Sequence, residues 1–474
     1  MSANGVVFRP LVLLIILVPW PLASDRPLGW AVLGLVVAVL LGVWSLLAAV
    51  GTPRTGLAMR PLLFVVVPML AALAWAAAQL SGLTSTAWAS PLWVEAQAVL
   101  GGETGAAISV DPDLGWLALM RSVTYAAVFF LAVQLCRRGH RAEAGVRAVA
   151  LTATAAALWG LGVYATGNST VLWYDKWAYQ QDLTGPFVNR NAFGAYLGLG
   201  LLACLAVMLD RLSALPMRRG RAREAAERVL LEALPWLLPI AVLATALLLT
   251  HSRGAFLATS LAAAVMLVVA MGSGLLGRWI GGLVILLIFV GAGGLLVSAG
   301  DVTLTRLIEQ AELEGDRGNL FRLTLNAIAA APWLGWGHGS FASAFLIYRD
   351  LGLPRPVFYD FAHSMPLEML MDLGIPAAAM MMLSLLSAGV ICAIGVVRRQ
   401  RRQHLPLLGL GVLLLISLHA AVDFPAQNPA VAITFAFLLG LGVAQSFSSQ
   451  RQLEEDAPIS AVGEPGETPP DPPR

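Results

Sequence analysis

The chain carries little charge for its length. Only 12% of its 474 residues are Asp, Glu, Lys or Arg, while 58% belong to the hydrophobic set AVILMFWYC. An ordinary soluble domain is about half apolar and about a quarter charged, so this composition excludes a soluble enzyme. The formal net charge of +2 is too small to indicate a nucleic-acid partner.

Lysine and cysteine are nearly absent as well. Lys176 is the only lysine, and all other basic residues are arginines, a bias that GC-rich coding explains without selection for guanidinium geometry. Cys136, Cys204 and Cys392 stand singly in or beside apolar stretches. No CxxC or Cys/His spacing is present, so neither a metal site nor a disulfide framework is predicted.

What the chain has instead is a series of long apolar windows. A membrane crossing needs about 20 such residues, and the sequence predicts twelve spans, at 8–23, 28–50, 62–80, 117–136, 148–166, 191–209, 235–250, 255–271, 279–299, 374–396, 406–422 and 429–445. The first window is interrupted by Pro19 and Pro21. No small-residue cleavage site follows it, so we expect an uncleaved helix rather than a signal peptide.

The basic residues orient these spans. Short cytoplasmic loops are enriched in Arg and Lys, and three strongly basic loops, 137–147, 211–228 and 398–402, fall on the same side of a twelve-span chain. Both termini are then cytoplasmic. In a bacterium, the chain is expected to be a multi-pass protein of the inner membrane with its other face in the periplasm.

The opposite face receives the segments 81–116, 167–190 and 300–373 and two short turns, 251–254 and 423–428. The loop 300–373 is far longer than a normal connection, and its Trp, Phe and Leu content argues against disorder. The sequence therefore predicts an all-α polytopic membrane protein with one transmembrane domain, 1–445, and a large, partly helical periplasmic loop. The Pro- and Glu-rich tail, 446–474, is predicted to be disordered.

The distribution of ionisable groups separates a transporter from an enzyme. Transporters keep charged residues in mid-span along the transported path, whereas here such residues, for example Arg121, lie near the span ends. A non-catalytic lipid-glycan transporter or flippase needs a polar path that these spans lack. The unusual polar residues gather at the outer ends, which favours a site at the outer membrane face.

The first cluster of such residues is Thr250-His251-Ser252-Arg253-Gly254, a tight turn between two apolar helices. A positive residue here runs against the topology bias. Arg253 either extends to the lipid headgroups beside a capping Ser252 or presents its planar fork to a phosphate group. In the second case, Ser252 and the first amides of the next helix add hydrogen-bond donors.

The second cluster is RGNLFRLTLNAIAAAPWLGWGHGSF, residues 317–341. Residues 319–331 are predicted to form an amphipathic helix with Arg317 and Arg322 near its start, and Pro332 ends it. The aromatic residues that follow are either interfacial anchors or the lining of a lipid or sugar groove. The glycines are not spaced as a nucleotide-binding fingerprint.

The third cluster is Ala362-His363-Ser364, which opens a helix carrying Glu368 about one turn on. His363 is either structural or a general base held in one tautomer by Glu368. Elsewhere, Asp111-Pro112-Asp113 is interpreted as a turn and helix cap rather than a metal-binding acid pair.

At these residues the chain resembles the O-antigen ligase and polymerase family of bacterial membrane glycosyltransferases. Five segments carry the resemblance in the family's order: GPFVNRNAFGAYL (185–197), LTHSRGAFLA (249–258), RGNLFRLTLNAIAAAPWLGWGHGSF (317–341), AHSMPLEMLMDLGI (362–375) and HAAVDFPAQNPAVAITFAFLLGL (419–441). The N-terminal third matches only in being hydrophobic.

The resemblance implies inverting, metal-independent transfer of a glycan from undecaprenyl diphosphate to an acceptor hydroxyl, with no cofactor. It implies that Arg253 and Arg317 hold the diphosphate, that Arg322 supports them, and that His363 activates the acceptor. Arg190, in FVNRN, is a weaker candidate for the same anionic pocket. Two positions depart from the family's frequent pattern, because Ala192 stands where relatives often have His and Ser364 where they often have Asn.

The predicted function is therefore surface-polysaccharide assembly at the periplasmic face. Within this class, the acceptor is a lipid A core (a ligase for lipopolysaccharide biosynthesis), a growing glycan (a polymerase) or a protein (an O-glycosyltransferase). The named residues serve all three because they handle the shared donor. The sequence pattern does not distinguish these three acceptors.

Overall fold

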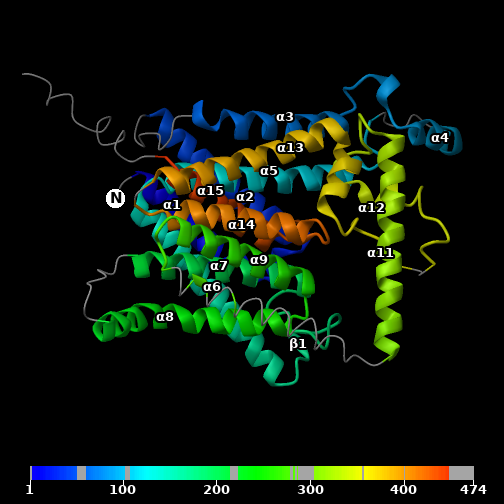
Figure 1. The fold of residues 1–474 in the computed structure, drawn as a ribbon. Coiled ribbons are helices and arrows are strands. Elements are labelled where there is room, and N and C mark those ends of the chain that lie inside the picture. The colour runs from blue at the N-terminus through cyan, green and yellow to red at the C-terminus, as the bar shows by residue number, and fades with distance from the viewer. Residues whose placement is uncertain are drawn as a thin grey trace, which may run out of the picture.

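The protein is described from a computed structural model, covering residues 3–50, 60–101, 107–213, 222–277, 281–282, 286, 304–354, 357–399 and 401–447. It is nearly all α-helical (Figure 1). The helices are α1 (Ala3–Leu17), α2 (Pro27–Ala49), α3 (Leu63–Leu80), α4 (Pro91–Leu100), α5 (Pro112–Leu135), α6 (Gly139–Ala165), α7 (Arg190–Ser213), α8 (Ala222–Leu249), α9 (Arg253–Gly272), α11 (Leu304–Ala330), α12 (Phe341–Phe345), α13 (Met365–Arg398), α14 (His404–Ala420) and α15 (Pro429–Gln445).

Short elements connect these helices. They are the 3-10 turns η1 (Leu22–Ser24), η2 (Arg60–Leu62), η3 (Thr86–Trp88) and η4 (Pro425–Gln427), and a two-stranded antiparallel hairpin of β1 (Thr170–Val171) and β2 (Tyr174–Asp175). Asp111 caps α5, because its side chain accepts a hydrogen bond from the amide of Leu114 at 3.2 Å. The interpretation of Asp111-Pro112-Asp113 as a helix cap is confirmed.

The spans agree with the sequence prediction where the structure describes them. Among those residues, eight helices are long and apolar enough to cross a membrane, and α1, α14 and α15 are shorter apolar helices. Each falls on a predicted window. The window 279–299 lies largely outside the described residues, so the count of twelve stays a prediction. The structure thus supports a polytopic membrane protein.

Helix α7 is at the centre of the bundle. It packs against α6, α8, α9 and α14, and nearly all of its apolar length is buried. Small residues permit this close packing, since a methyl group on Gly200 would lie 2.2 Å from the Cβ of Ala153 in α6. The start of α7 is thereby held at a fixed place among the helices that carry the predicted site.

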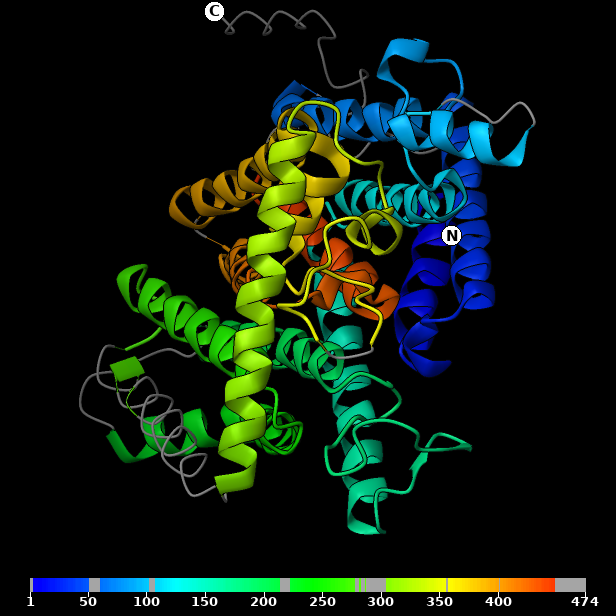
Figure 2. The same ribbon diagram turned by 90° about the vertical axis from the view of Figure 1, so that its right-hand side faces the viewer.

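Helix α11 lies across one end of the bundle. Figure 1 shows α11 running at a steep angle to the packed helices, and Figure 2 shows it crossing in front of them. The predicted helix 319–331 is confirmed up to Ala330, but α11 begins earlier, at Leu304. Helix α13 bends where Gly374 adopts φ 76° and ψ 162°, which separates its first turns from its long apolar part.

The basic loops come together at the other end. Arg402 Nε donates to Glu143 Oε1 at 2.8 Å, and Arg399 Nη1 donates to the carbonyl oxygens of Gln445 and Phe447 at 2.6 Å. Arg137 Nη1 donates to the carbonyl of Ala444 at 2.8 Å. The described arginines of two predicted cytoplasmic loops therefore share one end of the bundle, opposite α11.

Candidate active site

The predicted turn between α8 and α9 is built by side chains that cap the two helices. Thr250 Oγ1 donates to the carbonyl of Leu247 at 2.7 Å and accepts from the amide of Ser252 at 3.2 Å. Ser252 is the N-cap of α9 and accepts from the amide of Ala255 at 3.4 Å. Ser252 is buried, whereas Arg253, the first residue of α9, is exposed. The serine therefore fixes the turn that presents the arginine.

Gly254 brings this turn against α14. A methyl group at Gly254 would lie 3.1 Å from Cδ2 of His419, so the imidazole ring packs directly on the glycine backbone. His419 is buried near the end of α14, with its Nε2 3.6 Å from Oδ2 of Asp423. This turn, residues 250–254 and called the SRG turn below, is thus connected to Asp423 through one imidazole ring.

His363 lies on the other side of Asp423. Its Nδ1 is 3.5 Å from Oδ1 of Asp423, and its ring meets the edge of Phe424 with centroids 5.0 Å apart. The His363 backbone has φ 51°, in the left-handed region that residues other than Gly, Asn and Asp rarely adopt. A strained, partly exposed histidine facing a buried carboxylate is a geometry typical of functional sites.

Asp423 is the buried carboxylate of this group. Burial alone would raise the pKa of Asp423, but the neighbouring rings of His363 and His419 hold it below the ordinary value. Asp423 therefore stays ionised at neutral pH. Its carboxylate holds the neighbouring imidazole in one orientation and stabilises that ring when it takes up a proton.

Glu368 has a different position from the one expected. The sequence suggested that Glu368 orients His363, but its Oε2 accepts from the amide of Ala362 at 3.0 Å and its Oε1 accepts from Nε2 of Gln427 at 2.6 Å. Glu368 therefore joins the loop before α13 to the turn η4, and Asp423 is the carboxylate nearest the His363 ring. Glu368 supports the backbone that carries His363 rather than its ring.

Arg190 and the SRG turn share a second carboxylate, Asp182. Arg190 Nη1 donates to Asp182 Oδ2 at 2.9 Å, and His251 Nδ1 lies 2.8 Å from Asp182 Oδ1. Burial alone would raise the pKa of Asp182, but the hydrogen bond with His251 and the ion pair with Arg190 lower it. Arg190 is therefore held beside the turn that carries Arg253, and its guanidinium is paired with Asp182.

The only lysine organises the same loop. Lys176 Nζ donates to Asn168 Oδ1 at 2.9 Å and to the carbonyl of Asp182 at 2.6 Å. Burial lowers the pKa of Lys176 to about 8, although Asp182 opposes this shift. Lys176 thus ties the chain after the β-hairpin to Asp182 and, through it, to Arg190.

The two arginines of α11 differ in their surroundings. Arg322 Nη2 donates to Asp350 Oδ2 at 2.9 Å, and both side chains are exposed. Arg317 is also exposed and lies close enough to Tyr179 to act electrostatically on its hydroxyl. Arg190 has its Cζ 5.5 Å from the centroid of the Tyr179 ring. The structure therefore brings Arg317 and Arg190 to one tyrosine and pairs Arg322 elsewhere.

This difference makes Arg322 the least important of the predicted arginines. We expect Arg322→Ala to change the transfer rate less than about five-fold, because an exposed ion pair contributes about 0–1 kcal/mol. Asp350→Ala removes the same pair from the other side and serves as the control. A loss of 100-fold in Arg322→Ala, with Asp350→Ala still active, would place Arg322 at the diphosphate instead.

Sequence reasoning missed the carboxylates. Asp423 lies in a segment that carries the family resemblance and Asp182 in a predicted outer loop, but the sequence pattern predicts neither as a site residue. The signal for Asp423 was available, because His419 precedes it by four residues at the end of an apolar helix. The signal for Asp182 was absent, since nothing in the loop 167–190 indicates that it meets Arg190 and His251.

The fold and this site define a polytopic, helical membrane protein with basic and acidic side chains gathered at one end of its bundle. Residues 238–382 match the protein family described as O-antigen ligase. This match confirms the predicted resemblance to the O-antigen ligase family over that segment. It includes the SRG turn, α11 and His363, but not Asp182, Arg190 or Asp423. No curated protein matches the chain.

Proposed function

We propose that the protein transfers a glycan from undecaprenyl diphosphate to an acceptor hydroxyl at the outer face of the membrane, with inversion and without a metal. The observation that carries the proposal is the contact between the SRG turn and the His419–Asp423–His363 group. Through Gly254, the turn that carries the exposed Arg253 packs on His419, and Asp423 lies between the rings of His419 and His363. The family match supports a role in surface-polysaccharide assembly.

In the proposed reaction, His363 takes the proton of the acceptor hydroxyl, and the oxygen forms a bond to the anomeric carbon. The bond from that carbon to the diphosphate breaks on the opposite face, which inverts the configuration. Asp423 stabilises the protonated His363. Arg253 and Arg317, with Arg190 nearby, hold the charge that develops on the leaving undecaprenyl diphosphate.

The acceptor is a lipid A core, a growing glycan or a protein, and the family description favours the ligase reaction on a lipid A core. The test uses purified protein in lipid nanodiscs with glycan-loaded undecaprenyl diphosphate, each acceptor in turn, and EDTA. We expect acceptor-dependent release of undecaprenyl diphosphate. Absence of release with all three acceptors would rule out the proposed reaction.

The proposal also requires α11 and the loop after it to lie outside the cell membrane. Cys136, Cys204 and Cys392 are buried, so single cysteines introduced at exposed positions report accessibility with little background. Leu351, which is 95% exposed, lies beyond α11, and Arg401 lies at the opposite end of the bundle. We expect a membrane-impermeant maleimide to label Leu351→Cys in intact spheroplasts and Arg401→Cys only after permeabilisation. The reverse pattern would contradict the orientation.

A further inference from the structure

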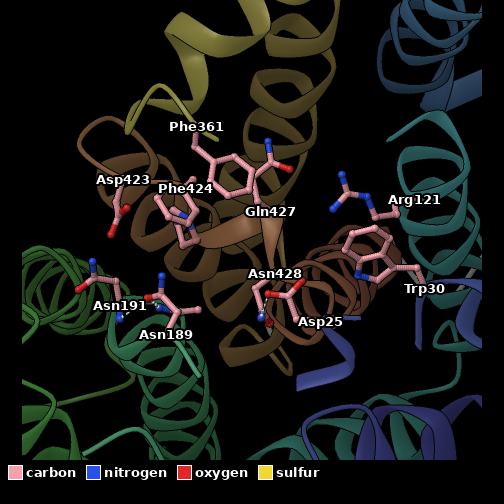
Figure 3. A pocket seen from close by; sticks show the side chains of 12 residues that line it. Asp25, Trp30, Arg121, Asn189, Asn191, Phe361, Asp423, Phe424, Gln427 and Asn428 are labelled. Atoms are coloured by element: carbon pink, nitrogen blue, oxygen red, sulfur yellow. Dashed lines mark hydrogen bonds between the residues drawn. The ribbon is translucent and has the colours of Figure 1, made fainter. Parts of the chain in front are cut away.

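A small cavity adjoins the proposed base on the side of α2 and α5. It has a volume of about 120 Å³ and is lined by Asp25, Trp30, Arg121, Asn189, Asn191, Ala192, Phe361, Asp423, Phe424, Pro425, Gln427 and Asn428. In Figure 3, Asp423 lies at one side of this pocket and Arg121 and Trp30 lie at the other. The pocket therefore begins at a residue of the His419–Asp423–His363 group and extends toward the N-terminal helices.

Three buried polar atoms of the lining have no hydrogen-bond partner among the described residues. They are Nε1 of Trp30, Nε of Arg121 and Oδ1 of Asp423, the last of which also faces Nδ1 of His363 at 3.5 Å. Buried polar atoms in proteins are nearly always paired. Two of these atoms are donors and one is an acceptor, so a ligand that both accepts and donates hydrogen bonds completes all three. Hydroxyl groups do both.

The charges of the lining disfavour an anionic ligand. Arg121 is its one cation, and Asp25 and Asp423 are its carboxylates. The Arg121 guanidinium also lies over the Trp30 ring, with Cζ 4.5 Å from the centroid. A diphosphate would face two carboxylates across a small space. A neutral, hydroxyl-rich ring meets no such repulsion.

The walls suit a sugar ring in other respects. Asn428 Nδ2 donates to Asp25 Oδ2 at 3.3 Å, which holds an amide and a carboxylate side by side. Phe361 and Phe424 stack with centroids 4.3 Å apart and form an apolar wall. Pockets for small ligands combine apolar and aromatic walls with a few placed polar groups, and this one adds the amides of Asn191 and Gln427.

We propose that this pocket binds an uncharged sugar ring of the acceptor, the ring that carries the attacking hydroxyl. Only the identity of this sugar as the acceptor rests on the proposed function. That the pocket binds a neutral sugar ring is inferred from the residues of the pocket itself. His363 contacts Phe424, a residue of the pocket wall, with ring centroids 5.0 Å apart.

The binding test uses soluble probes and does not depend on catalysis. The purified protein in nanodiscs is titrated with methyl glucoside, methyl galactoside, methyl mannoside, methyl N-acetylglucosaminide and methyl glucuronide, and binding is followed by saturation-transfer NMR. We expect at least one neutral glycoside to bind, and methyl glucuronide to bind at least ten-fold more weakly. If no neutral glycoside binds, or if the glucuronide binds equally well, the proposal is overturned.

Two conservative variants assign the binding to this pocket. Trp30→Phe removes the indole N–H and keeps a ring, and Asp25→Asn removes a charge and keeps the shape. We expect each to raise the Kd of the neutral glycoside about ten-fold or more. Trp88→Phe and Asp113→Asn, at residues that do not line the pocket, are the matched controls and should leave Kd unchanged. Unchanged binding in both pocket variants, with melting temperatures like wild type, overturns the assignment.

The transfer assay separates the acceptor from the first sugar of the donor, which has the same chemistry. We expect Trp30→Phe and Asp25→Asn to raise KM for the acceptor about ten-fold and to leave KM for the donor within two-fold. A rise confined to the donor KM overturns the acceptor assignment. Failure of the proposed function would abolish turnover in wild type but would leave the glycoside binding intact.

Discussion

Replacing His363 with Ala is expected to lower the rate of glycan transfer by about 100-fold to 10,000-fold, the usual contribution of a positioned general base. The physical reason is the position of the ring, whose Nδ1 lies 3.5 Å from the carboxylate of Asp423. No other histidine combines partial exposure with this carboxylate, since His419 is buried. The rate is measured as acceptor-dependent release of undecaprenyl diphosphate at saturating donor.

The control for this experiment addresses the backbone. His363 has a left-handed conformation, which Asn adopts more readily than Ala, so His363→Asn tests the ring with less effect on folding. His140, exposed at the other end of the bundle, is the matched position for a neutral His→Ala change. His363→Asn and His140→Ala should both insert into the membrane and have the melting temperature of wild type. Wild-type rates in His363→Ala and His363→Asn would show that the histidine is structural.

The helices and the turns were largely predictable because they depend on local patterns. Apolar windows located the described spans, and the run from Asn319 to Pro332 located the end of α11. Ser252 could be predicted as a cap because a serine stands at the boundary of an apolar run. The earlier start of α11 at Leu304 could not, since the polar residues before Arg317 give no clear apolar face.

The partners of the charged residues were not predictable in the same way. Glu368 lies five residues after His363, a spacing that favoured a direct contact, but the left-handed backbone at His363 places the ring beside a residue sixty positions later. That contact depends on how α13 packs on α14. Likewise, Arg322 is paired because the loop after α12 returns Asp350 to α11, and no local pattern encodes this return.

The contacts of the N-terminal third with the pocket beside α2 were also not predictable from the sequence. The sequence linked this part of the chain to the family only through its hydrophobicity. In the structure, Asp25, Trp30 and Arg121 meet residues of the α14–α15 connection. A single charged residue near a span end, such as Arg121, indicates a polar environment but not which distant segment supplies it.

The second large effect is expected at Arg253. Arg253→Ala should lower kcat by about 100-fold to 1,000-fold, as does removal of one charged contact to a developing oxyanion. The arginine stands at the start of α9, so in the proposed reaction the helix dipole and the guanidinium act on the same anion. Because the charge on the diphosphate grows as the glycosidic bond breaks, kcat should fall more than the donor KM rises.

A lysine at the same position separates charge from geometry. Arg253→Lys keeps the positive charge but loses the planar fork, so we expect a rate between those of wild type and Arg253→Ala. Arg322→Ala is the matched control, since Arg322 is an outer arginine already paired with Asp350. If Arg253→Ala and Arg322→Ala transferred glycan at the same rate, the SRG turn would be a membrane anchor and the diphosphate would lie elsewhere. A graded series, with wild type fastest, then Lys, then Ala, places the leaving group at the N-terminus of α9.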